Sequence, residues 1–225
     1  MESMDDALNK GCFMKTKENQ NTSALKRYYD IVKSGLFLFG LRNRLANIGI
    51  DINPYYWVEE EYKRCQVPKI KDDASKYTLK YLTIDEVRSI TRQYNTYSED
   101  IIKGLEKGQL CVGLEYEGEI ACYTFIELND FEIKKQSFKL KPNEAYLLNM
   151  WTFQKHRGKN LAPYLRYQTY RILEERGVNT KYSITQYFNK SSIKFKNKLN
   201  SKNHYLYLSI VLFKKYMWNF TLKKY

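Results

Sequence analysis

The chain has 225 residues, of which 43% are hydrophobic and 16% aromatic, so it can bury a sizeable core, and global disorder and low-complexity classes are excluded. Its four cysteines form no CxxC pair and only two histidines are present, which argues against a zinc ribbon, a disulfide framework or a His-rich metal site. The net charge of +13 is uneven, because residues 155–225 hold 16 basic and 2 acidic residues, a net +14. This charge suits phosphate-bearing partners, but a Lys-biased composition that only keeps the protein soluble would give the same charge.

The first 75 residues are expected to be a mainly helical extension outside the main sheet. Met1–Asn9 is acidic where a signal peptide is basic, and no apolar run reaches the ~20 residues of a membrane span, so we expect a soluble cytoplasmic protein. The elements predicted here are helices at Ala24–Val32 and Leu36–Leu45 and a turn at Asp51–Pro54. The linker-like stretch Pro68–Asp73 separates an accessory region, 1–75, from a main domain, 76–225.

The main domain shows a sharper alternation of strand and helix patterns. Strands are predicted at Tyr77–Leu82, Gln109–Tyr116, Glu119–Leu128, Ala145–Phe153, Thr180–Tyr187, Tyr205–Phe213 and Trp218–Leu222. Helices are predicted from a capping box at Thr83–Glu86 to Tyr94, from Ser98 to Gly108, over Gly158–Arg176 and over Ser191–Leu199, with a polar loop at Leu128–Asn143. This order predicts an α/β (α+β) fold in which helices flank a mixed β-sheet with one parallel crossover.

The junction from Phe153 to Ala162 joins a predicted strand to a predicted helix through a basic turn with small residues. The N–H groups of a first helical turn have no intrahelical partner, and the helix dipole adds positive charge there, so such a turn can bind phosphate. The sequence contains neither the GxxxxGK[ST] nor the GxGxxG phosphate motif. By itself, the junction is weak evidence and favours an ordinary strand-to-helix turn over a phosphate site.

In this order of elements, the six residues Arg157–Ala162 (RGKNLA) resemble the R/Q-x-x-G-x-G/A motif of the GNAT acyltransferase superfamily. Arg157 and Ala162 match its ends, whereas Asn160 stands where the first motif glycine is expected. The segment from Asn189 to Ile193 (NKSSI) is similar to the family's N-x-x-S/A-I segment. The resemblance covers about residues 77–225 and implies the GNAT fold, in which two central strands splay apart.

The resemblance further implies acyl transfer from an acyl-CoA, with acetyl-CoA as the donor, to an amine. The CoA phosphates would lie over Arg157, Gly158, Lys159, Asn160, Leu161 and Ala162. The pantetheine arm would pair with the strand end at Trp151, Thr152 and Phe153, as an added strand does, and would contact Asn189 and Ser192. No metal is implied.

Two proton-transfer roles are needed, because the acceptor amine must lose a proton and the departing thiolate should gain one. The strand-end carboxylates Glu144 and Glu127 are the candidate bases, with a surface charge as the alternative for each. The family's usual thiol-protonating Tyr lies about seven residues after the motif Asn, a position occupied here by Lys196. Lys196 is therefore a candidate donor, the alternative being a solvated lysine, and Tyr164 and Tyr187 are neighbouring substitutes.

The acceptor is expected to be an amine-bearing small molecule or sugar, including a nucleotide-linked sugar, as in enzymes associated with bacterial surface-polysaccharide modification. Other classes stay open. Tyr–Lys interleaving at Asn203–Tyr225 suits nucleic acid, although core packing explains the same aromatics, so a nucleic-acid partner is not expected. The segment Ala24–Ile48 suits peripheral contact with an anionic membrane. A homodimer and a GNAT fold that binds CoA without catalysis are further alternatives, the latter because of Asn160 and Lys196.

Overall fold

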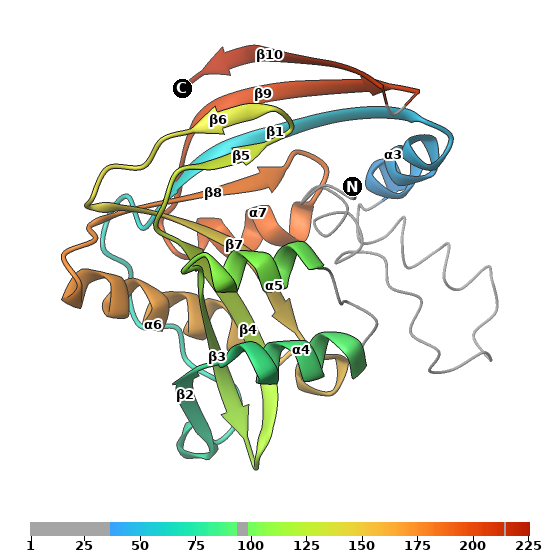
Figure 1. Ribbon diagram of the computed structural model, residues 1–225. Coiled ribbons are helices and arrows are strands. Elements are labelled where there is room, and N and C mark those ends of the chain that lie inside the picture. Colours follow the sequence, from blue (N-terminus) through green and yellow to red (C-terminus); the bar gives the residue numbers. More distant parts are fainter. Residues whose placement is uncertain (1–36, 94–98, 214) are drawn as a thin grey trace.

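The computed structural model describes residues 37–93, 99–213 and 215–225 (Figure 1). The helix predicted at Ala24–Val32 and the helix cap predicted at Ser98 lie outside the described residues. Helix α3 (Phe37–Asn47) agrees with the helix predicted over Leu36–Leu45. None of the helices in the described part of the chain is long and apolar enough to cross a membrane.

An eight-stranded sheet forms the centre of the molecule, in the order β10-β9-β1-β8-β7-β4-β3-β2 (Figure 1). Its strands are β1 (Ile50–Glu60), β2 (Tyr77–Tyr81), β3 (Leu110–Tyr116), β4 (Glu119–Glu127), β7 (Glu144–Thr152), β8 (Thr180–Gln186), β9 (Lys202–Leu212) and β10 (Tyr216–Lys224). All neighbouring strands run antiparallel except β7 and β8, which are parallel and are connected through helix α6 (Leu161–Glu175). The predicted mixed sheet with one parallel crossover is therefore confirmed.

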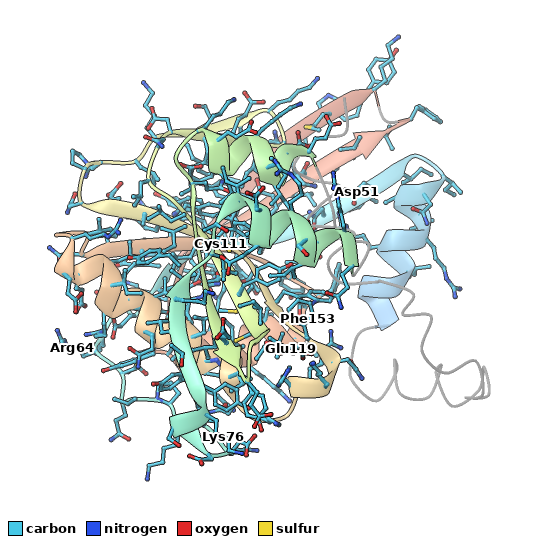
Figure 2. The ribbon with its side chains drawn as sticks, turned by 60° about the horizontal axis from the view of Figure 1, so that its bottom comes forward. Asp51, Arg64, Lys76, Cys111, Glu119 and Phe153 are labelled. Carbon is cyan, nitrogen blue, oxygen red and sulfur yellow. The ribbon has the colours of Figure 1, made fainter. Side chains whose placement is uncertain are left out.

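Helices cover both faces of this sheet, and each face has its own apolar cluster. Helices α4 (Ile84–Gln93) and α5 (Glu99–Glu106) pack on one face, where Val87 and Ile102 meet Cys111 of β3. Helix α6 and helix α7 (Lys190–Asn197) pack on the other face, where Leu165 meets Val112. Figure 2 shows Cys111 in the middle of the packed side chains.

The capping box predicted at the start of α4 is present. The Thr83 amide donates to Glu86 Oε2 at 2.8 Å, and the Glu86 amide donates to Thr83 Oγ1 at 3.3 Å. This reciprocal pair satisfies two amides that the first helical turn leaves without partners. Short 3₁₀ turns at Ala74–Lys76 and Gln154–His156 precede β2 and follow β7.

Strand β1 is the largest departure from the sequence prediction. The turn expected at Asp51–Pro54 is wrong, and so is the expectation that residues 1–75 lie outside the sheet, because residues 50–60 pair with both β8 and β9. Pro54 is tolerated in β1 because its backbone groups face a point just beyond the end of β8. Its carbonyl accepts there from the amide of Tyr187, one residue after β8, so the N–H that proline lacks removes no bond to β8. The domain boundary near residue 75 stays a prediction.

The polar loop predicted at Leu128–Asn143 contains a small hairpin, β5 (Phe131–Ile133) and β6 (Gln136–Phe138). Its turn residues, Lys134 and Lys135, both have positive φ, which lysine rarely adopts, so the sequence carries no ordinary hairpin signal. The hairpin is held by aromatic stacking, with Phe138 4.6 Å from Trp57 between ring centroids. It therefore covers the central strands on the α4–α5 face.

Candidate functional site

The two parallel strands β7 and β8 pair only at their first residues. Glu144, Ala145 and Tyr146 are in register with Thr180, Lys181 and Tyr182, after which β7 continues to Thr152 and β8 to Gln186 without pairing with each other. A gap therefore opens in the middle of the sheet, and the backbone groups that face it have no ladder partner. Such an edge can pair with an extended ligand as though the ligand were a strand. The splay implied by the family resemblance is present.

A β-bulge in β7 explains why the strands part. Phe125 of β4 faces Leu148, but Tyr123 faces Trp151, so β7 has one extra residue in between. Asn149 lies in this bulge with φ of 49°, a left-handed conformation that Asn tolerates better than most residues. Because a bulge bends and twists its strand, it turns the rest of β7 away from β8.

Where β7 and β8 have parted, three buried polar side-chain atoms have no hydrogen-bond partner among the described residues: Trp151 Nε1, Thr185 Oγ1 and Gln186 Oε1. If the register of Tyr146 and Tyr182 is continued past the bulge, Trp151 lies across the gap from Gln186. Buried polar atoms are costly unless they are paired, so these positions suit a ligand with its own polar groups. Thr185 and Gln186 are neighbours in β8, so their side chains point to opposite faces of the sheet. The sequence offered no signal for Thr185 or Gln186.

The turn after β7 has the geometry of an anion site. Gly158 has φ of 82° and Asn160 has φ of 64°, so α6 begins at Leu161, three residues later than predicted. The Asn160 side chain donates to the Lys69 carbonyl at 2.7 Å and makes no capping hydrogen bond to α6. Asn160 therefore adopts the left-handed conformation for which the family uses glycine, and Leu161 and Ala162 start the helix behind it.

The basic side chains Arg157 and Lys159 of this turn have different kinds of partner. The exposed Arg157 guanidinium lies 5.4 Å from the Trp151 ring centroid, and its Nε donates to the Thr152 carbonyl at 3.1 Å. Lys159, in contrast, is engaged with the segment predicted as a linker, since its ammonium lies 2.7 Å from Asp72 Oδ2. Phe153 is buried at the end of β7, where its amide donates to the Ala121 carbonyl. Figure 2 shows Phe153 in the part of the molecule that contains the turn.

Asn189 and Ser192, the second motif, lie at the start of α7. Asn189 Oδ1 accepts a hydrogen bond from the Ser192 amide at 3.0 Å, so the motif Asn caps the helix. Both residues follow β8 directly, at the same end of the sheet as the open part of the gap. Their contact with a pantetheine arm stays a prediction.

The two candidate carboxylates do not lie at the open part of the gap. Glu127 is buried at the end of β4, where it accepts from Gln109 Nε2 at 2.9 Å and from the amides of Leu128 and Asn129. Glu144 begins β7 and accepts from the Lys141 amide at 3.0 Å. It is opposite Thr180, about 13 Å along β8 from Ile184 at ~3.3 Å per residue.

Lys196 is buried at the gap, so the alternative of a solvated lysine is wrong. Its Nζ donates to Ser183 Oγ at 2.6 Å and to the Ile184 carbonyl at 3.1 Å. Backbone groups of alternate residues in β8 face β1, as the bond from Tyr187 to Pro54 shows, so those of Ile184 face β7 and the gap. Burial lowers the pKa of Lys196 to about 8, with the Arg166 charge acting in the same direction and Glu60 opposing both.

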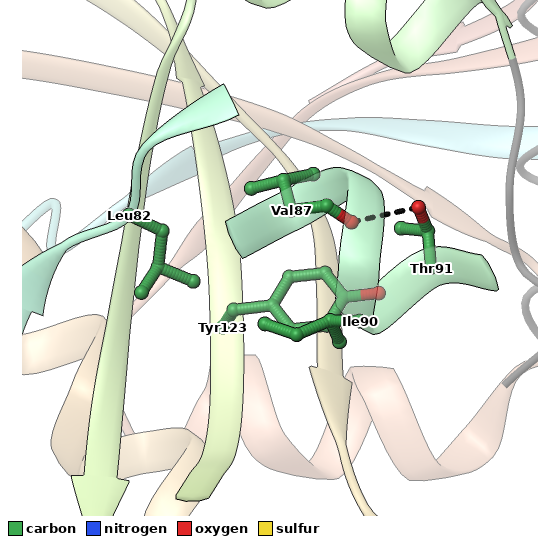
Figure 3. A pocket seen from close by; sticks show the side chains of 5 residues that line it. All are labelled: Leu82, Val87, Ile90, Thr91 and Tyr123. Carbon is green, nitrogen blue, oxygen red and sulfur yellow. Dashed lines mark hydrogen bonds between the residues drawn. The ribbon is translucent and has the colours of Figure 1, made fainter. Parts of the chain in front are cut away.

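A separate, shallow apolar hollow lies between α4 and the sheet (Figure 3). It is lined by Leu82, Val87, Ile90, Thr91 and Tyr123. It has no room for a water molecule, whereas typical small-molecule sites have roughly 300–1,000 Å³, and the Thr91 hydroxyl already donates to the Val87 carbonyl. Among the described residues, no His, Cys, Asp and Glu side chains converge as a possible metal site.

Comparisons with known proteins agree with this geometry. A family model described as the acetyltransferase (GNAT) family matches residues 74–200. A GNAT-family protein from Novosphingobium aromaticivorans superposes with a TM-score of 0.50 at 17% identity, covering 73% of this chain and 65% of its own. A GNAT-family acetyltransferase from Colwellia psychrerythraea gives 0.52 at 12% identity, covering 75% and 60%. The chain thus spans less than two thirds of the length of these structures. No curated protein sequence matches it.

Proposed function

The chain belongs to the GNAT acetyltransferase family, and we propose that it transfers an acetyl group from acetyl-CoA to an amine. The observation that carries this proposal is the gap between β7 and β8, which opens beside the turn at Arg157–Ala162. Acetyl-CoA has an extended, amide-containing arm with phosphates at one end and the thioester at the other. A strand edge in line with an anion-binding helix start is suited to hold such a molecule.

In this proposal the start of α6 binds the pyrophosphate, and Gly158 and Asn160 let the backbone approach it closely. Arg157 and the surrounding charge of residues 155–225 supply the attractive field. The edge formed by Trp151–Phe153 pairs with the pantetheine amides. Lys159 contributes little direct charge, because Asp72 neutralises it.

Lys196 is the proposed proton donor to the leaving sulfur. As the amine nitrogen forms its bond to the acetyl carbon, the carbon–sulfur bond breaks, and Lys196 Nζ gives a proton to the thiolate. The amine loses one proton to solvent, and Lys196 is reprotonated from solvent. Glu144 and Glu127, the bases expected from the sequence, lie away from the open part of the gap and take no direct part in this step. A donor whose pKa lies near that of a thiol, ~8.5, can both give and regain the proton near neutral pH.

The proposed acceptor is an amine-bearing small molecule or sugar, with nucleotide-linked amino sugars included because residues 155–225 attract phosphate. A fungal structure described as a glucosamine N-acetyltransferase region superposes with a TM-score of 0.54, at 12% identity and covering 87% of this chain and 24% of its own. At that identity it supports the fold alone. The acceptor therefore has to be found by assay.

Two measurements test the proposal in sequence. Acetyl-CoA should raise the melting temperature of the protein as its concentration passes the dissociation constant, and a flat curve to millimolar concentration would reject the site. Release of free CoA thiol is then followed with a panel of simple amines, amino sugars and nucleotide-linked amino sugars. Binding without release for every amine would favour a GNAT fold that binds CoA without catalysis.

A further inference from the structure

The Lys196 ammonium belongs to a buried group of charged and polar side chains from three elements. Glu60 of β1 lies 3.5 Å from Lys196 Nζ through its Oε1. Its other oxygen, Oε2, accepts a hydrogen bond from Tyr170 at 2.6 Å and lies 3.3 Å from Arg166 Nε. The side chains of Glu60, Arg166 and Lys196 are exposed by only 0%, 3% and 6%, and Tyr170 is fully buried.

This group holds one carboxylate between two cations. A buried charge without a partner is costly, and arginine does not give up its proton in proteins, so Lys196 is the member that can relieve the excess positive charge. Burial alone would raise the pKa of Glu60, but Arg166 and Lys196 outweigh it and hold the pKa below its usual value. Glu60 is therefore an ionised carboxylate that stabilises the protonated form of Lys196.

We infer that Glu60 is a positioning residue for Lys196, and that it keeps the lysine protonated and aimed at the gap so that it can donate to the leaving sulfur. This inference rests on the proposed function. The inference means that β1, which precedes the residues 74–200 matched by the family model, contributes a residue to the proposed proton-donor arrangement. Without Glu60, burial and Arg166 would leave Lys196 neutral near pH 7, with no proton to give. Without Arg166, Lys196 would hold its proton more tightly.

The chain provides a matched control in the next residue. Glu61 is also buried, but its carboxylate contacts Arg171 and lies 3.3 Å from Lys181. Lys181 contacts Glu61, whereas Lys196 contacts Glu60. Glu61→Gln therefore removes an equally buried negative charge that pairs with Lys181 and not with Lys196. The titratable and charged groups that face Lys196 are Glu60 from β1 and Arg166 from α6, and Tyr170 of α6 contacts the other oxygen of Glu60.

The experiment is a pH titration of Lys196 by NMR in the full-length protein labelled with ¹³C-lysine, with its ε-methylene signal assigned by its loss in Lys196→Met. The expected midpoint is near pH 8 in the wild type. Glu60→Gln should lower it by about one unit or more, the usual effect of removing an opposite charge. Arg166→Gln should raise it, Glu61→Gln should leave it unchanged, and Glu60→Asp should lower it less than Glu60→Gln.

A lowered titration midpoint in Glu60→Gln is diagnostic, because loosening of the structure would instead raise the pKa of Lys196 towards the ordinary lysine value of ~10.4. A wild-type midpoint near that value, or an unchanged or raised midpoint in Glu60→Gln, would overturn the inference. If Glu60→Gln does not fold, Glu60→Asp and Arg166→Gln provide the test, because the Lys196 midpoint should fall in the first and rise in the second. The proposed function is read separately, from the ultraviolet absorbance of the bound CoA thiolate. Lys196 beside the sulfur should lower the pH at which bound CoA ionises, and Lys196→Met should abolish that effect.

Discussion

The carbonyl oxygen of Ile184 accepts a hydrogen bond from Lys196 Nζ at 3.1 Å, at a point where β8 has already parted from β7. In a continuous parallel sheet, a backbone group that faces the neighbouring strand is used by that strand. Here a side chain from α7 takes its place, and the ammonium is held where the thioester of an arm between the strands would end. The gap and the proposed proton donor are thus parts of one arrangement.

The first prediction concerns the pH dependence of turnover. The pKa of Lys196 is lowered to about 8, so the donor is protonated at neutral pH and loses its proton as the pH rises through that value. The kcat should fall over this range, and Lys196→Met should lower kcat at neutral pH by about 10²-fold or more and remove this limb of the profile. Steady-state CoA release from pH 6 to 10, roughly spanning the lowered and ordinary lysine values, measures both effects.

The pH dependence of stability provides an independent check on the lowered pKa of Lys196. As the pH rises, stability should increase whereas kcat should fall. Between about pH 8 and ~10.4 the unfolded chain binds a proton at this lysine and the folded protein does not, so folding becomes more favourable as pH rises. The free energy of unfolding of the wild type, relative to Lys196→Met, should therefore increase across this window in denaturant titrations. A constant difference would mean that Lys196 has an ordinary pKa in the folded state.

The second prediction concerns Gly158, whose φ of 82° is strained for any residue with a side chain, although a Cβ there would meet no atom within 4 Å. Gly158→Ala should cost stability by about 1–2 kcal/mol and weaken acetyl-CoA binding, because the new methyl group lies where phosphate approaches. Gly177→Ala is the control. It has φ of 78°, is equally uncrowded, and lies at the other end of α6, about 22 Å away at ~1.5 Å per residue.

The two glycine variants separate strain from binding. Both should lower the melting temperature by similar amounts, but only Gly158→Ala should raise the dissociation constant for acetyl-CoA in isothermal titration calorimetry. Equal affinities in the two variants would show that the phosphates bind elsewhere.

The third prediction revises the role of the N-terminal region. A chain that begins at residue 75 lacks β1, which separates β8 from β9 in the sheet and supplies Glu60. Such a chain should be insoluble or fail to bind acetyl-CoA, whereas one that begins at Phe37 keeps every described element. Soluble yield and thermal shift with acetyl-CoA compare the two. A chain from residue 75 that is folded and binds acetyl-CoA would restore the original view of an accessory region.

The fold could be predicted where local signals and tertiary structure agree. The capping box at Thr83 and the strand–helix–strand crossover around α6 are both read from neighbouring residues. Strand β1 could not be predicted in this way, because Asp51, with its ion pair to Arg42, and the buried Glu60 interrupt the apolar pattern. Their partners are far along the chain or in other elements.

The candidate site shows the same division. The turn at Arg157–Ala162 and the splay of the strands follow from a local motif and from family resemblance. The burial of Lys196 does not, because it depends on Glu60, 136 positions earlier, and on the packing of α6 against α7. From the sequence, Glu144 or Glu127 is expected to matter more than Lys196, because the amine must lose a proton whereas a CoA thiolate is a tolerable leaving group without a strong acid. The geometry leads us to expect the opposite order in mutant activity, because Lys196 lies at the gap and the two carboxylates do not.

The last prediction concerns Asp72, which lies in the segment predicted as a linker and neutralises Lys159 beside the phosphate turn. Asp72→Asn keeps a polar side chain near Tyr77 and the Asp73 amide but removes the negative charge, so the Lys159 ammonium gains its full attraction for phosphate. Acetyl-CoA should bind a few-fold more tightly at low ionic strength, and the gain should disappear in ~1 M salt, where charges are screened beyond ~3 Å. Titration calorimetry at both salt concentrations measures this, and Lys159→Met in the Asp72→Asn background should cancel the gain. Weaker binding in Asp72→Asn would instead mean that the Asp72–Lys159 pair shapes the turn, because the Lys71 amide donates to the Lys159 carbonyl at 2.9 Å and holds the same segment.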